Sequence, residues 1–173
     1  MATGNEKRYA DQVMECESVS IGVSGSKIPM TGTSSRRLVI EDVLAVTLTA
    51  AQSGALIIFD KVDGSTITLP PPIVGLWYDF DVDVASTSVG QKIITDAATT
   101  FIKGVLNKVV TATGATTQDT ANGTTHLSIN MNGTTTGGIA GSRFRLTCRS
   151  ATVWKVEGYL NSSGTLATSF ATT

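Results

Sequence analysis

Short apolar runs alternate with turn-forming residues throughout the stretch 44–85. Two glycine-containing turns, at 53–54 and 63–64, and three consecutive prolines at 70–72 separate these runs. Runs of this length, rich in Val, Ile, Thr and aromatic residues and bounded by Gly and Pro, are typical of β-strands joined by tight turns. The pattern therefore predicts an all-β region without long helices.

Strand-like runs continue to the end of the chain at a spacing of roughly 8–14 residues, the rhythm of β-sandwiches and jelly rolls. Side chains alternate along a strand, so one shared face is predicted for Leu76, Tyr78, Phe80, Val82 and Val84. The predicted strands cover residues 43–49, 55–60, 65–69, 76–84, 91–95, 99–106, 124–131, 142–148, 152–159 and 165–170. We expect one antiparallel β-sandwich or jelly-roll-like domain over residues 38–173, without a convincing internal repeat.

The first 37 residues differ from the rest because they hold many charges and several turn formers. Residues 9–17 have the spacing of a short helix, and the Gly and Pro residues after them oppose longer regular structure. Val19, Ile21 and Val23 alternate with small residues, which predicts a strand able to add to a sheet edge. We expect an extended N-terminal arm over residues 1–37. It either docks on a neighbouring subunit or a shell, or is a tail without function.

Two segments poor in core-forming residues are predicted to be surface loops. They cover residues 111–123 and 132–141 and consist largely of Thr, Gly, Ala and Asn. Long polar loops lie on the surface or at contacts, because they have little to bury.

Composition and charge narrow the class of protein. Of the 173 residues, 41% are hydrophobic and 16% are charged, and the formal net charge is −1. This content suffices for a core but provides no electropositive surface for nucleic acid. No apolar run approaches the roughly 20 residues of a membrane span. Residues 1–11 are polar and lack the apolar segment of a secretion signal, so we expect synthesis in a cytoplasm.

The groups that ordinarily carry catalysis are scarce. His126 is the only histidine, and no nucleophile and carboxylate pattern accompanies it. Ser24 lies in a glycine-containing segment that does not match a nucleophile elbow, and no phosphate-binding loop occurs. Cys16 and Cys148 fit no metal spacing and are expected as free thiols, with a disulfide between them left open. The sequence therefore predicts no enzyme, no cofactor and no metal site.

Two stripes of like charge follow the two-residue spacing of strands, which places each stripe on one sheet face. They consist of Asp79, Asp81 and Asp83, and of Arg143, Arg145 and Arg149. Three interpretations remain open: two solvated faces, an acidic strand opposite the arginine strand of the same or another subunit, and a cation such as calcium at the aspartates. A straight strand spreads the carboxylates that calcium needs to converge, which disfavours the third.

The two tryptophans differ in their neighbours. Trp77 shares the face of the aspartates, which places it at a subunit interface or at the edge of the core. Trp154 lies between apolar strand residues and is expected in the core.

Several short motifs occur in a fixed order along the chain. They are Ser53-Gly54-Ala55-Leu56, Asp63-Gly64, Thr66-Ile67-Thr68-Leu69-Pro70, Gly75 before Tyr78 and Phe80, and later Gly141, Phe144, Leu146, Trp154, Val156 and Gly158. Together they resemble the small β-modules of tailed-phage virion proteins. Such modules occur in capsid decoration (cement) proteins and in fibre-like appendages.

The resemblance implies an oligomeric, often trimeric, β-sandwich or jelly-roll-like subunit without a cofactor. It implies a structural protein of the capsid exterior, made in the host cytoplasm. Such a protein decorates the phage shell and stabilises it by bridging subunits of the major capsid protein, with no nucleic-acid or membrane partner. The residues expected at its interfaces are Val19, Ile21, Val23, Trp77 and the two charged stripes.

Two other functions remain as alternatives. The first is a receptor- or glycan-binding module of a tail fibre or spike, in which Trp77, Tyr78 and the Thr- and Asn-rich loops contact sugar. The second is an enzyme that assembles its carboxylates from distant strands.

Overall fold

The computed structural model describes residues 30–31, 34–35, 38–41 and 44–173. The predicted helix at 9–17 and the predicted strand at 19–23 lie outside these residues. The chain divides into two units, residues 1–38 and residues 39–173. In the first unit, β1 (Met30–Thr31) pairs antiparallel with β2 (Ser34–Ser35).

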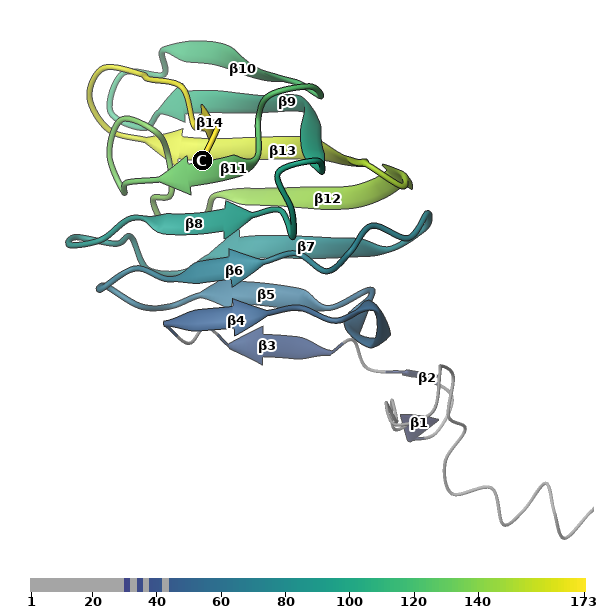
Figure 1. The fold of residues 1–173 in the computed structure, drawn as a ribbon. Helices are drawn as coiled ribbons and strands as arrows, with labels where there is room; N and C mark the ends of the chain where they lie inside the picture. Colours follow the sequence, from purple (N-terminus) through teal and green to yellow (C-terminus); the bar gives the residue numbers. More distant parts are fainter. Residues whose placement is uncertain (1–29, 32–33, 36–37, 42–43) are drawn as a thin grey trace, which may run out of the picture. The chain divides into compact units, whose positions relative to one another are not determined.

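The regular elements of the second unit are strands, apart from one short helix. They are β3 (Val39–Glu41), β4 (Ala45–Thr47), β5 (Leu56–Phe59), β6 (Thr66–Thr68), β7 (Trp77–Val82), β8 (Gln91–Ile94), β9 (Phe101–Val110), β10 (Thr116–Asn122), β11 (Ser128–Met131), β12 (Arg143–Ser150), β13 (Val153–Ser162) and β14 (Phe170–Ala171), with one short 3-10 helix, η1 (Ala50–Gln52). A seven-stranded sheet has the order β10-β9-β13-β12-β7-β5-β3, and a five-stranded sheet has the order β14-β11-β8-β6-β4 (Figure 1).

Residues 39–94 form a coil, here called the parallel coil, that passes alternately through the two sheets. β3, β5 and β7 are parallel neighbours in the larger sheet, and β4, β6 and β8 are parallel neighbours in the smaller one. Each turn of the coil therefore adds one strand to each sheet. β3, β5 and β7 begin at residues 39, 56 and 77, so successive turns take 17 and then 21 residues. This uneven length explains why no repeat is recognisable in the sequence.

Residues 101–171, here called the closing half, cover one side of the coil. β12 runs antiparallel beside β7, and β11 runs antiparallel beside β8. β13 then pairs antiparallel with β12 and parallel with β9, and β10 completes that sheet. The expectation of an antiparallel domain is therefore wrong, because both sheets are mixed. Apolar alternation reports which face a residue occupies but carries no information about strand direction.

One hydrophobic core lies between the two sheets. Ile57, Phe80 and Phe144 are register partners on the inner face of the larger sheet, and none is more than 2% exposed. Ile67 and Ile93 form the matching row in the smaller sheet. The rings of Phe80 and Phe144 stack with centroids 5.0 Å apart, which joins the coil to the closing half. Of the five residues predicted to share one face, Tyr78, Phe80 and Val82 are fully buried, whereas Leu76 and Val84 are partly buried. The predicted place of Trp154 in the core is confirmed.

Three predicted segments meet different outcomes. The segment 111–123 was expected to be a loop, but Thr116–Asn122 forms edge strand β10 because its backbone pairs with residues 103–109 of β9. The segment 132–141 is a loop, as expected. The strand expected over 165–170 is wrong except at its last residue, since β14 begins at Phe170.

Candidate binding surface on the seven-stranded sheet

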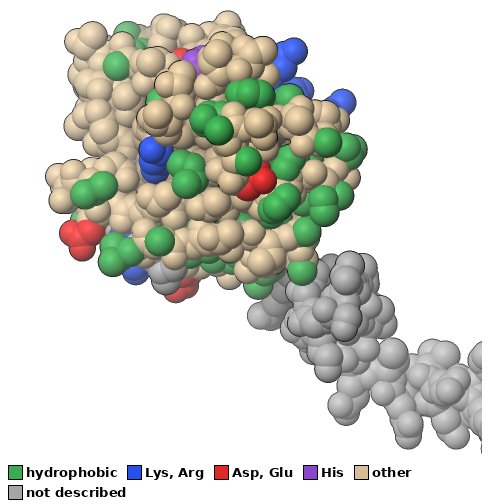
Figure 2. All heavy atoms as spheres, viewed as in Figure 1, with side chains coloured by type: hydrophobic (Ala, Val, Ile, Leu, Met, Phe, Trp, Pro, Cys, Tyr) green, Lys and Arg blue, Asp and Glu red, His purple; other side chains and the backbone are tan. Residues whose placement is uncertain are grey.

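The outward face of the larger sheet carries most of the side chains that the sequence singles out. Strand register places Asp79 directly opposite Arg145, and Asp81 opposite Arg143, because β7 and β12 are neighbours. The two charged stripes therefore belong to the same sheet of the same chain. By contrast, uncharged polar side chains and backbone dominate the outward face of the smaller sheet, which is turned to the viewer in Figure 2.

Asp79 and Arg145 form a two-point ion pair. Arg145 Nε donates to Asp79 Oδ1 at 2.6 Å, and Nη2 donates to Oδ2 at 2.8 Å. The carboxylate is almost covered, with 5% of the side chain exposed, whereas 44% of the Arg145 side chain is exposed. The hydrogen bond with Asp79 raises the pKa of Arg145 above its ordinary value. This pair favours the interpretation of an acidic strand opposite an arginine strand, within one chain.

Trp77 is half-buried beside this pair. The Arg145 guanidinium carbon lies 4.4 Å from the centroid of the Trp77 ring, a cation–π arrangement. The Trp77 ring also packs against the turn at Gly54, where an added Cβ would lie 3.4 Å from the ring atom Cζ2. Trp77 therefore packs within its own sheet, and its expected place at an interface stays a prediction.

The other members of the stripes are less constrained. Asp83 lies beyond the end of β7, and Arg149 lies at the register shift of β12, so both leave the regular rows. In the described ranges no ion pair involves Asp81, Asp83, Arg143 or Arg149. Those ranges also contain no group of three or more His, Cys, Asp or Glu placed to hold a metal ion. Both carboxylate oxygens of Asp79 accept hydrogen bonds from Arg145, which disfavours Asp79 as a calcium ligand.

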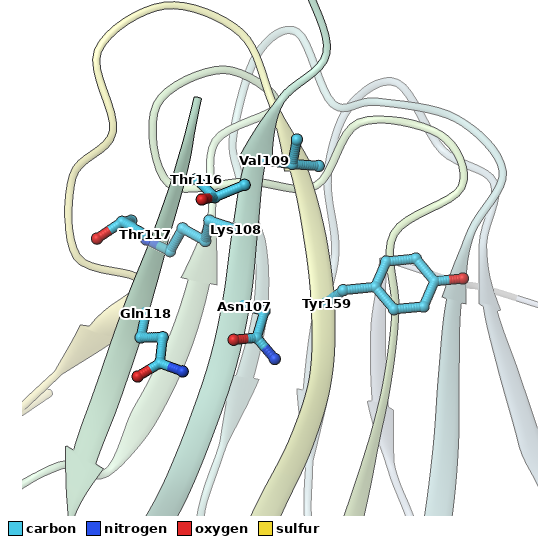
Figure 3. A pocket seen from close by; sticks show the side chains of 7 residues that line it. All are labelled: Asn107, Lys108, Val109, Thr116, Thr117, Gln118 and Tyr159. Atoms are coloured by element: carbon cyan, nitrogen blue, oxygen red, sulfur yellow. The ribbon is translucent and has the colours of Figure 1, made fainter. Parts of the chain in front are cut away.

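An open hollow of about 580 Å³ lies on the same outward face, near the β10 edge of the sheet (Figure 3). Its lining comes from β9, β10 and β13. Tyr159, Asn107 and Gln118 are register partners across these three neighbouring strands, so their side chains form one row on the outward face. Figure 3 shows Asn107 between Gln118 and Tyr159. The described residues that line it are Asn107, Lys108, Val109, Thr116, Thr117, Gln118 and Tyr159.

Beneath this hollow, Lys108 turns to the inner face of the sheet. Its ammonium lies 2.7 Å from the Asp119 carboxylate, with 1% of the Lys108 side chain exposed, and it also donates to the Ala167 carbonyl. The Ser169 N–H and the Thr168 hydroxyl donate to the same carboxylate, at 2.5 and 2.9 Å. Burial raises the pKa of Asp119, but these hydrogen bonds and the Lys108 charge lower it by more, so it lies below its ordinary value.

The described candidates for catalysis, His126 and Cys148, make contacts that belong to the packing of the fold. His126 accepts a hydrogen bond from the Asn122 N–H at 3.2 Å through Nδ1, and its ring stacks on Phe170 at 5.6 Å. Cys148 is buried, and burial raises the pKa of its thiol, which makes it a poor nucleophile. Ser24 and Cys16 lie outside the described residues. No helix in the described part of the chain is long and apolar enough to cross a membrane.

Sequence reasoning missed the row of Asn107, Gln118 and Tyr159. Alternation along the segments 101–110 and 153–162 indicates that Asn107 and Tyr159 point outward. It does not indicate that β9 and β13 are neighbours, and β10 was predicted to be a loop. The sequence of each strand therefore indicated which side chains point outward, but it did not indicate which strands pair to bring these side chains into one row.

The edge of the parallel coil is the second notable surface. β3 pairs with β5 and β4 pairs with β6, and no other described strand covers their outer edges. Val39 is 48% exposed and Leu44 is 68% exposed beside these edges. The two other sheet edges differ, because β10 presents Thr and Gln residues and β14 has only two residues.

Comparison with protein-family models, with curated proteins and with solved structures gives no match to this chain.

Proposed function

We propose that this chain is a structural protein of a tailed-phage particle. In this proposal its sandwich-like module decorates the capsid exterior and bridges subunits of the major capsid protein. It acts as a homo-oligomer, with a trimer as the expected form. The N-terminal arm contributes to attachment in the same proposal, although the arm lies outside the described residues.

The observation that carries the proposal is the open side of the parallel coil. Exposed strand edges pair readily with other chains, and proteins that stay monomeric shorten their edges, charge them or cover them. β3 and β4 end both sheets on the same side, with Val39 and Leu44 exposed beside them. Such a double edge suits a subunit that assembles through backbone pairing and aliphatic contact.

The motifs behind the phage resemblance occupy defined places in the coil. Gly54, Gly64 and Gly75 lie in connections between successive strands and have φ values of 89°, 79° and 96°. At Gly64 an added Cβ would lie 1.6 Å from the Val89 carbonyl oxygen, so only glycine fits where two turns of the coil stack. The first group of resembling motifs thus lies in the coil, and the second group, from Gly141 to Gly158, lies at and within β12 and β13 of the closing half.

The alternative in which Trp77 and Tyr78 contact sugar requires both side chains to be accessible to the ligand. Tyr78 is fully buried, and its hydroxyl donates to the Thr49 carbonyl at 2.8 Å. Burial, with a smaller contribution from Cys148, raises the pKa of Tyr78 to about 12. Trp77 is half-buried beside Arg145. A glycan site that includes Tyr78 is therefore not proposed.

The test of the proposed function is the copy number of this protein in purified phage particles. Quantitative mass spectrometry measures it against the major capsid protein of the same particles. We expect a ratio near parity, because a decoration protein occupies sites repeated over the whole shell. A few copies per particle would move the protein to the tail or a fibre, and absence from the particle would overturn both placements.

A further inference from the structure

We propose that the hollow at Asn107, Gln118 and Tyr159 binds a neutral polysaccharide. Its volume of about 580 Å³ falls in the range of roughly 300–1,000 Å³ typical of ligand sites. The proposal goes beyond the structural role and does not depend on it, because a shell protein and a fibre module can both carry such a site. It uses neither Trp77 nor Tyr78, although Thr116, Thr117 and Gln118 of its lining belong to the Thr-rich segment 111–123.

The two amides supply the polar chemistry. Asn107 and Gln118 are register partners on neighbouring strands, and both are exposed on the outward face. Each side-chain amide offers a carbonyl acceptor and two N–H donors. Neighbouring sugar hydroxyls also donate and accept, so paired amides match them without a net charge. Within the described part of the chain no hydrogen bond occupies either side-chain amide.

Tyr159 supplies the aromatic surface. It is 48% exposed and is the one aromatic residue among the large hydrophobic side chains that are exposed in the described ranges. A tyrosine ring offers an apolar face and a polar hydroxyl, which suits the C–H face and the hydroxyl rim of a pyranose. Adjacent strands are roughly 4.8 Å apart, so the row from Tyr159 to Gln118 spans about 10 Å. That length favours a chain of sugars over a single small ligand.

The lack of a free charge among the described lining residues favours a neutral ligand. Among the described lining residues, Lys108 is the only ionisable one besides Tyr159, and its ammonium is buried on the opposite face against Asp119. The hollow therefore presents amides, hydroxyls and one ring, but no free charge. Arg143 is the register partner of Tyr159 on the strand next to the hollow, so an acidic polymer is the competing ligand to be tested.

The same surface is a poor match for a protein partner. Protein interfaces centre on apolar and aromatic anchors that become fully buried. The exposed aliphatic side chains Val62, Ile73 and Val89 all lie in the parallel coil, and the hollow offers only the half-buried Val109. A polar ligand with one stacking contact therefore fits the hollow better than a second protein surface does.

The test is an NMR titration of the full-length, ¹⁵N-labelled protein. The probes are maltotetraose, cellotetraose, mannotetraose and the acidic tetragalacturonate, each to about 10 mM, since a weak site binds in the millimolar range. We expect at least one neutral probe to shift the side-chain amide signals of Asn107 and Gln118 in a saturable manner. Tyr159→Ala should weaken that binding about tenfold, and Tyr159→Phe, which keeps the ring, should stay within about threefold.

Matched variants separate the site from the fold. Asn107→Ala and Gln118→Ala should each weaken binding about fivefold. Glu157→Gln changes an exposed neighbour on the strand of Tyr159 and should leave binding unchanged. The proposal is overturned if no neutral probe shifts the two amides, if tetragalacturonate alone binds, or if Tyr159→Ala binds like the original chain. Concentration-dependent shifts of the same amides without sugar would instead identify a contact between copies, which also overturns it.

Discussion

The parallel coil and the closing half build the same two sheets in different ways. In the coil every strand pair is parallel, and the inner row of the larger sheet is apolar from Ile40 through Ile57 to Phe80. The closing half continues that row through Phe144 but ends it at Asp119 on β10. The coil repeats one structural unit, a turn that adds a strand to each sheet, whereas the closing half ends in the buried ion pair of Lys108 and Asp119.

This difference explains why the two sides of the molecule are unlike. A coil can accept another turn at this side, because no other described strand pairs with the outer edges of β3 and β4. The closing half cannot, since β10 carries exposed polar residues and the C-terminal segment is tied to Asp119 through Thr168 and Ser169. Assembly is therefore expected at the coil side, and binding of small polar ligands at the closing side.

The largest expected effect is on assembly at the open side of the coil. Val39→Lys with Leu44→Lys places two charges beside the unpaired edges, which opposes strand addition. We expect the dissociation constant of the oligomer to rise about 100-fold, as each desolvated charge costs on the order of 1 kcal/mol or more. Size-exclusion chromatography with light scattering measures this. Val89→Lys is the control, because Val89 is 69% exposed but away from the edge. Equal behaviour of the two proteins would refute an interface at β3 and β4.

A second effect, on stability, is expected at Gly158 in the closing half. Its φ is 151°, and an added Cβ would lie 2.4 Å from the Phe144 Cα, a backbone atom that cannot move aside. We expect Gly158→Ala to lower the free energy of unfolding by about 3 kcal/mol, measured by urea denaturation. At Gly114, where φ is 70° and nothing lies within 4 Å, the same change should cost about 1 kcal/mol. Equal losses would show that contact with Phe144 is not the cause.

The coil also shows which parts of the fold the sequence can predict. Tyr78, Phe80 and Val82 were predicted to share one face, and all three are buried, because alternation in a strand encodes which side chains lie on the same side. Strand direction was wrong, since the turns that separate β5 from β6 and β6 from β7 resemble hairpin turns in composition. The pairing of Asp79 with Arg145 was one of three open interpretations, because it requires β7 and β12, far apart in sequence, to be neighbours.

The buried pair at the far edge provides the next test. Lys108→Met removes the partner of a carboxylate that stays buried, and we expect a loss of about 3 kcal/mol in the free energy of unfolding. Lys108→Met combined with Asp119→Leu removes both charges and should recover most of that loss. A double-mutant cycle in urea measures the coupling. A double variant no more stable than Lys108→Met would mean that Asp119 stabilises the C-terminal segment mainly through Thr168 and Ser169.

The same carboxylate predicts the pH dependence of stability. The pKa of Asp119 is lower in the folded chain than in the unfolded one, where it is about 3.9. Its contribution is therefore complete above that value and is lost as the pH falls through the lower, folded pKa. Urea denaturation from pH 6 downward should show stability falling in acid, and the Asp119→Asn variant should show a shallower fall. An unchanged slope in that variant would assign the acid sensitivity to other carboxylates.

The smallest expected effect lies at the junction of the two halves, where Asp79 on β7 meets Arg145 on β12. Asp79→Asn keeps the shape but weakens the two-point ion pair, and we expect a loss of about 1 kcal/mol because Arg145 remains largely in water. Asp81→Asn, on the same strand and without an ion pair among the described residues, should change the free energy of unfolding by less than about 0.5 kcal/mol. Both are measured by urea denaturation at low and high salt, since only the Asp79 effect should shrink as salt screens the pair. If both variants behave alike, packing of Phe80 on Phe144 joins the halves without help from this ion pair.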